Sequence, residues 1–400
     1  MKARPAGSAV LALALAAAAP AAADLARDNS MFALDLYRAL APAPGNLFFS
    51  PYSLSTALAM TCAGARGDTE KQMAATLRFS LGPEELHPAF ADLSARLART
   101  QKEGKAQWTA ANSIWPQQQY PFLPEYVALL EKDYGVAVTP LDFGDPEAAR
   151  ARINGWVEEK TRDKIRNLIQ PGFINALTRL ALVNAIYFKG TWAVPFNPIA
   201  TSDAPFHTAP DRTVQAPMMA RKLKCAYAHF PELDLVELPY AGGDVAMLIL
   251  LPAATDGLRA LEQQLTADRL GAWRDGMGEY DVQVTLPRFR MTSAFQLNDT
   301  LSAMGMPDAF DDQLADFSGM DGRPNWLYIG AVLHKAFVEV NEEGTEAAAA
   351  TAVVMQPRAL PPGRPVEFTA DHPFVFLIVE RRTGSILFMG RLADPTKTGE

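Results

Sequence analysis

The stretch that most constrains the fold is residues 335–359, which read KAFVEVNEEGTEAAAATAVVMQPRA. Its first part, 336–340, is apolar and partly β-branched, interrupted by one glutamate, and predicts a strand. Three acids, Glu342, Glu343 and Glu346, then surround Gly344 and Thr345, and four alanines follow at 347–350. Prolines at 357, 361 and 362 argue against a regular element beyond that point.

Two structures fit this stretch on residue types alone. Alanine is the best helix former, so a short helix could precede a proline-rich loop. Alternatively, the stretch is a loop whose small residues let it enter between existing strands, while the acids at its base keep it soluble. Alanine is also a poor strand former, so propensity leaves both structures open.

Longer motifs in the rest of the chain favour the second structure, a loop that can enter between strands. They are LFFSPYSLSTALAM at 47–60, LVNAIYFKGTW at 182–192, LHKAFVEVNEEGTEA at 333–347, HPFVFLI at 372–378 and LFMGRLADP at 387–395. Together with EEGTEAAAAT at 342–351, they resemble segments of the serpins, in that family's order, over nearly the whole chain after about residue 25. The hinge resembles that of inhibitory serpins in particular.

The resemblance implies an α+β fold with a central five-stranded sheet that can accept the reactive loop as a sixth strand, two further sheets and about eight to nine helices. Strand and helix patterns that alternate without βαβ regularity agree with a mixed fold. The resemblance also implies a serine-type endopeptidase inhibitor. In the family mechanism, a serine protease attacks the loop, here about 342–366, and forms an acyl-enzyme, and the loop inserts before deacylation and traps the protease covalently.

Counting along the hinge, the resemblance places the reactive bond at Arg358-Ala359. The preceding subsite residues are Met355, Gln356 and Pro357. Arginine suits a trypsin-like pocket with a buried carboxylate; Arg364 is a rival, but the proline after it hinders cleavage. About 14 inserted residues at roughly 3.3 Å each span on the order of 45 Å, the length of one long strand. The hinge comprises Glu342, Glu343, Gly344, Thr345, Glu346, Ala347, Ala348, Ala349, Ala350 and Thr351.

A second group of residues matches the polar cluster that controls sheet opening in the family. Ser50 precedes Pro51 and is expected to cap a helix that starts there, and Ser53 follows one turn later. Asn184 falls in a strand that is apolar on both sides, so it needs a buried partner, for which the family offers His334. Trp192 matches the tryptophan where the loop first inserts. A purely structural alternative stays open. In it, Ser50 and Ser53 cap the helix and His334 is a hydrogen-bonded core histidine, and none of them controls sheet opening.

The N-terminus predicts a signal peptide at 1–23. Two basic residues precede an apolar run from about residue 9 to 19 and the sequence AAA at 21–23. Cleavage after residue 23 is the first choice and after residue 19 the second; the apolar run is too short for a membrane anchor. The remaining 24–400 predict a single serpin domain that is secreted or periplasmic. The alanine-rich composition suggests a bacterial source.

Several functional classes are not expected. The formal net charge is −8 without a basic stripe, which argues against nucleic-acid or membrane partners. None of the five histidines lies in a known catalytic motif, and no cofactor or metal site is predicted. The two cysteines, Cys62 and Cys225, are expected to be unpaired because the family's architecture separates their elements.

The predicted partner is therefore a trypsin-like serine protease, bound covalently by a monomeric inhibitor. The alternatives are a non-inhibitory serpin acting as substrate, carrier or chaperone, an inhibitor of a cysteine protease, or an enzyme or scaffold on the same fold. The small residues of the hinge favour the inhibitor, since non-inhibitors often carry proline, charge or bulk there.

Overall fold

The computed structural model describes the chain apart from residues 1–8, 104–105, 137, 177, 346–364 and 400. Within that part, the α-helices are α1 (Ala9–Leu40), α2 (Pro51–Cys62), α3 (Gly67–Thr76), α4 (Pro83–Glu103), α5 (Pro124–Leu129), α6 (Pro146–Lys160), α7 (Leu258–Gln264), α8 (Ala267–Asp275), α9 (Asn298–Met304) and α10 (Ser318–Asp321). Short π or 3-10 turns are η1 (Leu130–Tyr134), η2 (Pro198–Ala200) and η3 (Pro307–Phe310).

The strands of the described residues are β1 (Leu47–Phe49), β2 (Ala106–Pro116), β3 (Leu180–Thr191), β4 (Ser202–Ala209), β5 (Arg212–His229), β6 (Leu233–Pro239), β7 (Val245–Pro252), β8 (Gly278–Pro287), β9 (Phe289–Gln296), β10 (Val332–Asn341), β11 (Gly344–Thr345), β12 (Val366–Thr369), β13 (Phe374–Glu380) and β14 (Ile386–Leu392). The mixed α+β architecture expected from the sequence is confirmed.

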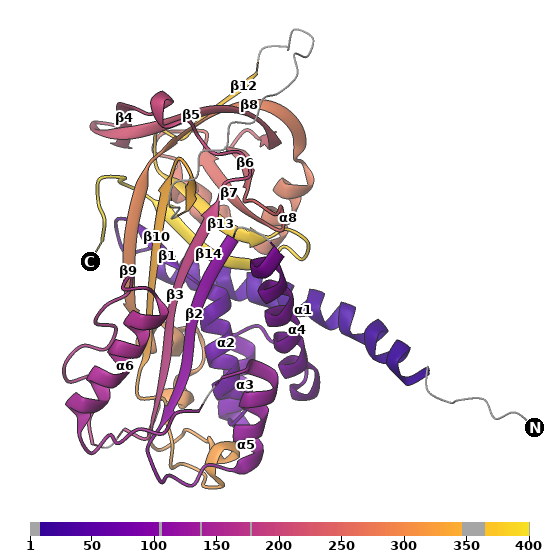
Figure 1. Cartoon of the computed structure of the whole chain (residues 1–400), viewed down its shortest axis with the longest axis vertical. Helices are drawn as coiled ribbons and strands as arrows, with labels where there is room; N and C mark the ends of the chain where they lie inside the picture. The colour runs from indigo at the N-terminus through magenta and orange to yellow at the C-terminus, as the bar shows by residue number, and fades with distance from the viewer. Residues whose placement is uncertain (1–8, 104–105, 137, 177, 346–364, 400) are drawn as a thin grey trace, which may run out of the picture.

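The central sheet has the strand order β2-β3-β11-β10-β9, and its long strands run along the length of the molecule (Figure 1). β3 and β10 are parallel and pair directly over six residues of each strand, from Val332 opposite Leu182 to Phe337 opposite Tyr187. Beyond this stretch the two strands separate, and β11 lies between them. The sheet has the expected five strands, but one of them is the start of the hinge itself.

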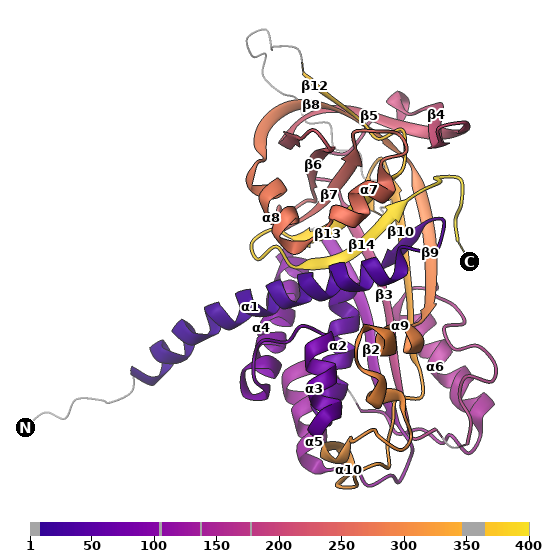
Figure 2. The same ribbon diagram turned by 180° about the vertical axis from the view of Figure 1, so that it is seen from behind.

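Both faces of the central sheet are covered, which explains why β3 is apolar on both sides. Val183 and Ala185 pack in one hydrophobic cluster with Ile153 and Val157 of α6. The residue between them, Asn184, faces the other side and reaches α2. Figures 1 and 2 show α6 and α2 on opposite faces of these strands.

The remaining strands form one nine-stranded sheet in place of two separate ones. Its order is β1-β14-β13-β7-β6-β5-β8-β12, and β4 also pairs with β5. The 18-residue β5 joins two groups of strands, because its last residues pair with β6 while its middle pairs with β8. The two further sheets expected from the resemblance are therefore connected through this strand.

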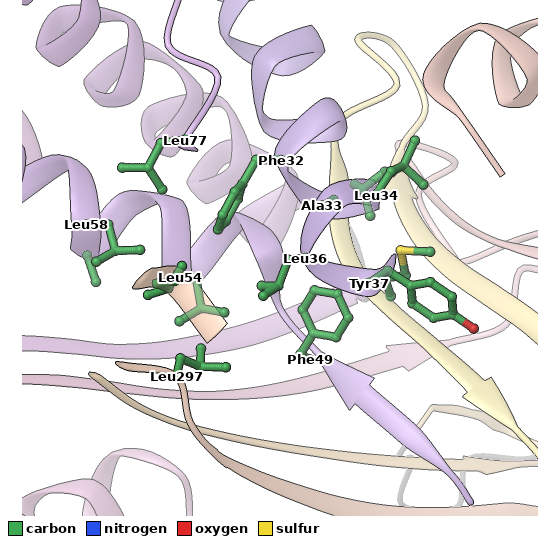
Figure 3. Close-up of a cluster of buried hydrophobic side chains, with 14 of the residues drawn as sticks. Phe32, Ala33, Leu34, Leu36, Tyr37, Phe49, Leu54, Leu58, Leu77 and Leu297 are labelled. Carbon is green, nitrogen blue, oxygen red and sulfur yellow. The ribbon is translucent and has the colours of Figure 1, made fainter. Parts of the chain in front are cut away.

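The hydrophobic core beneath the sheets gathers residues far apart in the sequence. Figure 3 shows Phe32, Leu36 and Tyr37 of α1 packed near Phe49 of β1 and Leu54 of α2, and all are buried. α1 begins at Ala9, within the predicted signal peptide, and residues 258–275 form two helices, α7 and α8, separated by Leu265 and Thr266.

Candidate functional site

Most of the predicted loop lies outside the described residues. This applies to Glu346, Ala347, Ala348, Ala349, Ala350, Thr351, Met355, Gln356, Pro357, Arg358, Ala359 and the rival Arg364. The first four hinge residues, Glu342, Glu343, Gly344 and Thr345, are described, and so is every member of the predicted sheet-opening cluster.

The chain reverses direction immediately after β10. Asn341 pairs with Gly344, and Val340 with Thr345, in an antiparallel hairpin whose two turn residues are glutamates. The side-chain Oδ1 of Asn341 accepts from the backbone N–H of Glu343 at 3.1 Å and of Gly344 at 3.2 Å, which stabilises the turn. The hinge therefore starts as a strand that enters the central sheet between β10 and β3.

Glycine is required at position 344 by the closeness of β3. Gly344 has φ of +152°, and a Cβ atom there would lie 1.9 Å from the carbonyl oxygen of Gly190. Gly190 is itself crowded, since a Cβ atom there would lie 2.6 Å from the Tyr240 ring. These two glycines allow the hinge backbone to pair with β3 next to an aromatic side chain.

Thr345 enters a buried pocket of aromatic residues at the upper end of β3. Its side chain is fully buried, and its Oγ1 lies 2.7 Å from Oη of Tyr240. The Tyr240 ring stacks on Trp192, with centroids 4.6 Å apart and an interplanar angle of 10°. Trp192 donates from Nε1 to the carbonyl of Asn341 at 3.0 Å, so the expected tryptophan contacts the hinge directly.

Glu342, one of the acids at the base of the loop, is buried. Its carboxylate Oε1 accepts from Oγ1 of Thr201 at 2.5 Å and from the guanidinium of Arg288, and its side chain is only 6% exposed. Burial by itself raises the pKa of Glu342, but the hydrogen bonds from Thr201 and Arg288 outweigh it and hold the pKa below its ordinary value. The hairpin explains this burial, because it places Glu342 in the turn, where its carboxylate reaches Thr201 and Arg288.

The four polar residues predicted at the sheet-opening cluster form one connected, buried network. Asn184 of β3 and His334 of β10 are direct register partners, with Nδ1 of His334 2.5 Å from Oδ1 of Asn184. Asn184 Nδ2 donates to Oγ of Ser53 at 2.7 Å. The backbone N–H of Ser50 donates to Nε2 of His334 at 3.0 Å, and Oγ of Ser50 caps α2 by accepting from the N–H of Ser53.

The network determines the protonation of His334. Its Nε2 accepts a hydrogen bond from a backbone N–H, so this nitrogen carries no proton, and Nδ1–H donates to Asn184. The ring is 1% exposed, and burial lowers the pKa of His334 to about 3. The histidine is thus a neutral hydrogen-bonding group that joins two strands.

This network joins three layers of the protein. It connects β3 to β10 across the central sheet, connects both strands to the start of α2, and reaches β14 through the bond from Oγ of Ser50 to the Leu387 carbonyl at 2.7 Å. Separating β3 from β10 at this level would break the bond between Asn184 and His334. The arrangement can therefore hold the sheet closed below β11.

Sequence reasoning missed several residues that the structure places in the site. Tyr240 follows β6, Arg288 precedes β9 and Thr201 precedes β4. All three are distant from the hinge in the sequence and contact it only in the folded protein. No local pattern singles them out. The one available signal was the buried-strand glycine at 190, whose missing side chain indicates a close neighbour.

Further observations on the described residues concern metal binding, membrane spans and the two cysteines. Among its residues, no group of His, Cys, Asp and Glu side chains could hold a metal ion. In the same part of the chain, no helix has the length and apolar character needed to cross a membrane. Cys62 and Cys225 are both buried and free, and burial raises the pKa of each thiol to about 12.

Comparison with known proteins decides the family. The family model described as serpin (serine protease inhibitor) matches residues 27–395. The chain belongs to the serpin family. Because this is a family of protease inhibitors, this serpin is not an enzyme.

Curated relatives of this serpin include leukocyte elastase inhibitor A of Rattus norvegicus and leukocyte elastase inhibitor of Homo sapiens, each 41% identical over 93% of this chain and 99% of the relative. Ipis-1 of Ixodes persulcatus is also 41% identical, over 91% of this chain and 97% of its own length. These relatives come from animals, so the suggestion of a bacterial source is not borne out.

Solved serpin structures match the fold over nearly the whole chain. Uncleaved ovalbumin has a TM-score of 0.83 at 30% identity and covers 93% of this chain and 100% of its own. Serpin48 of the insect Tenebrio molitor has a TM-score of 0.82 at 31% identity, with 93% and 98% coverage. Human thyroxine-binding globulin, solved as a complex, has a TM-score of 0.83 at 30% identity, with 94% and 100% coverage.

Proposed function

We propose that this serpin inhibits a trypsin-like serine protease as a suicide substrate that is attacked at Arg358-Ala359. The single observation that carries the proposal is the entry of the hinge into the central sheet at Gly344 and Thr345. A loop whose first residues already pair with both flanking strands needs no new nucleation step in order to insert further. The small residues after Thr345 favour the same process.

The chemistry belongs to the protease. Its serine hydroxyl attacks the carbonyl carbon of Arg358, an ester forms, and the C–N bond to Ala359 breaks as the leaving amine takes a proton from the catalytic histidine. Water would normally hydrolyse this ester. Insertion of the freed loop pulls the acyl-linked protease away and distorts its oxyanion hole and triad before hydrolysis.

The observed pairing defines the register for continued insertion. Thr345 lies opposite Gly190 of β3 and Val340 of β10. If the loop continues in this register, Thr351 comes to lie opposite both Asn184 and His334, and Met355 reaches Leu180 at the beginning of β3. Insertion must therefore pass through the buried polar network about halfway down the sheet.

The experiment that tests the proposal mixes the purified protein with trypsin at near-equal amounts and analyses the products on a denaturing gel. We expect a band at the summed mass and cleavage after Arg358, mapped by mass spectrometry. Thr345→Arg should abolish the band and leave a cleaved substrate, because it buries a charge at the first insertion step. Thr369→Arg, the same change at an exposed threonine of β12, is the matched control and should leave the band unchanged. Cleavage without a band by the natural protein would refute trapping.

A second candidate target is an elastase-like serine protease, because the similar curated relatives are named leukocyte elastase inhibitors. The same gel with elastase separates the candidates: a stable band with cleavage displaced from Arg358 would favour the second. A non-inhibitory role would give cleavage by both proteases and a band with neither.

Secretion and a monomeric state are also part of the proposal. The basic, apolar and alanine segments of residues 1–23 support a signal peptide. The mass of the protein recovered after expression with its full N-terminus should correspond to a chain that begins at Asp24, and size exclusion should give a single 24–400 chain. Recovery of an intact N-terminus from the cytosol would contradict secretion.

A further inference from the structure

The chain after β14 covers part of one edge of the central sheet. β9 is the last strand in the order β2-β3-β11-β10-β9, so its outer edge has no neighbouring strand within the described residues. The backbone N–H of Thr292, in the middle of β9, donates to the carbonyl of Thr398 at 2.8 Å. Figures 1 and 2 both show the C-terminus beside β9. We call residues 393–399 the tail.

The tail approaches β9 so closely that it requires a glycine. Gly399 has φ of +63°, and a Cβ atom there would lie 2.1 Å from the carbonyl oxygen of Thr292. The left-handed conformation and the closeness of the two backbones both favour glycine at this position. The tail therefore lies directly against the backbone of Thr292.

One side chain holds the tail in this position. Oδ1 of Asn46, just before β1, accepts from the N–H groups of Ala393 at 2.8 Å and Asp394 at 2.9 Å. Nδ2 of Asn46 donates to the carbonyls of Asp394 at 2.8 Å and Lys397 at 2.9 Å. Asp394 also closes a turn, because its carboxylate accepts from the N–H of Thr396 at 2.9 Å. These bonds give the tail a defined conformation.

The outer edge of β9 has four positions whose backbone groups point away from β10. Leu297, which follows β9, donates its N–H to the Val332 carbonyl of β10. Backbone groups alternate in direction along a strand, so the odd-numbered residues of β9 point to β10 and the even-numbered residues point outward. The outward positions are Arg290, Thr292, Ala294 and Gln296. An edge of this kind can pair with a further strand.

This edge is complementary to a second copy of itself. When two antiparallel copies of β9 use all four outward positions, Arg290 pairs with Gln296 of the other copy, and Thr292 with Ala294 of the other copy. No like charges lie opposite each other in this register, and Arg290, Ala294 and Gln296 are exposed. The pairing has the two-fold symmetry that is commonest among dimers. The same strand of a second copy of this chain therefore fits the edge.

We propose that the tail prevents this pairing, and that the partner it excludes is a second copy of this chain. The tail occupies Thr292, the second of the four outward positions, so a second β9 could use only Ala294 and Gln296 without interruption. Covering an edge is one way in which proteins avoid edge-to-edge association. This role is independent of the proposed protease inhibition, since it involves neither the hinge nor the reactive bond.

The test compares full-length variants by sedimentation equilibrium. Gly399→Ala should displace the tail and raise the dimer association constant at least about tenfold, because the N–H and carbonyl of Thr292 become available for pairing. Asn46→Ala removes the four bonds to the tail and should act in the same direction. Gly243→Ala is the matched control: this glycine has φ of +80° and nothing within 4 Å of an added Cβ atom, so the association constant should stay unchanged.

A proline at position 294 identifies the edge that is used. Ala294→Pro removes an outward N–H, so in the Gly399→Ala background it should abolish the dimer while leaving the bonds between β9 and β10 intact. Dimers that persist in this double variant would overturn the inference, and so would an association constant that neither Gly399→Ala nor Asn46→Ala changes.

Amide hydrogen exchange provides a readout that requires no dimer. The N–H of Thr292 should be protected in the natural protein and in Gly243→Ala, and should exchange at least about tenfold faster in Gly399→Ala. Fast exchange of this N–H in the natural protein would also overturn the inference, because the tail would then not cover the edge. None of these outcomes affects the trapping gel, which tests the proposed function separately.

Discussion

Substitution of Asn184 by alanine tests whether the buried polar network keeps the sheet closed. The change removes two hydrogen bonds, to Nδ1 of His334 at 2.5 Å and to Oγ of Ser53 at 2.7 Å, and all three residues are at least nine-tenths buried. An orphaned buried donor costs about 1–3 kcal/mol and an ordinary lost bond about 1 kcal/mol, so the native state should lose about 3 kcal/mol.

Asn184→Ala should destabilise the closed sheet more than the form in which the loop is inserted. Insertion separates β3 from β10, and the bond between Asn184 and His334 is then broken in the natural protein as well. The barrier to opening should therefore decrease by up to about 3 kcal/mol, which corresponds to about a hundredfold faster spontaneous loss of inhibitory activity. Ser53→Ala removes only one of the two bonds and should give an intermediate rate.

The assay follows residual trypsin inhibition during incubation at a fixed temperature, together with the midpoint of the first urea transition. Gln263→Ala, which removes an exposed amide from α7, is the control. If Asn184→Ala lost activity within twofold of this control and kept its urea midpoint, the network would not be what holds the sheet closed.

Three further predictions concern charge and backbone at the same site. Burial keeps the pKa of His334 at about 3, below the value of about 6.5 in an unfolded chain, so stability should be full above pH 6.5 and decrease as pH falls toward 3. His334→Gln keeps one acceptor and one donor and should flatten that part of a urea-midpoint profile; an unchanged slope would assign the dependence to other groups. Arg288→Met should destabilise by about 3 kcal/mol, measured by urea unfolding, because it removes the ion-pair partner of the buried Glu342 carboxylate and leaves it the hydrogen bond from Thr201. Glu342→Gln should cost only about 1 kcal/mol, since Arg288 is half-exposed, and equal costs would contradict this asymmetry. Gly344→Ala should displace the hinge from β3 and change the tryptophan fluorescence through Trp192, whereas Gly82→Ala, which meets nothing within 4 Å, should not.

The sequence predicted the family and the mixed fold, because these depend on motifs in which neighbouring residues act together. The cap of α2 is an example: Ser50 and Pro51 are adjacent, and the bond to the N–H of Ser53 follows from helix geometry alone. The resemblance, not a local pattern, named the residues of the polar network, and their role in sheet opening stays a prediction. The break between α7 and α8 and the start of α1 at Ala9 were not predicted, since boundaries depend on tertiary packing as well as on local preference.

The environment of the hinge could not be predicted for a different physical reason. Strand alternation applies only while the chain stays extended, and a two-residue turn at Glu342 and Glu343 restarts it in the opposite direction. The turn lacks the asparagine–glycine pair that usually marks a hairpin; it is stabilised instead by the side chain of Asn341, whose role appears only in the folded structure. This one turn buries Glu342 and Thr345 on different partners, and in the proposed mechanism it sets the register in which the loop inserts. If the turn is displaced, the loop loses both its first pairing and its alignment with the polar network, so the rate and the register of insertion should change together.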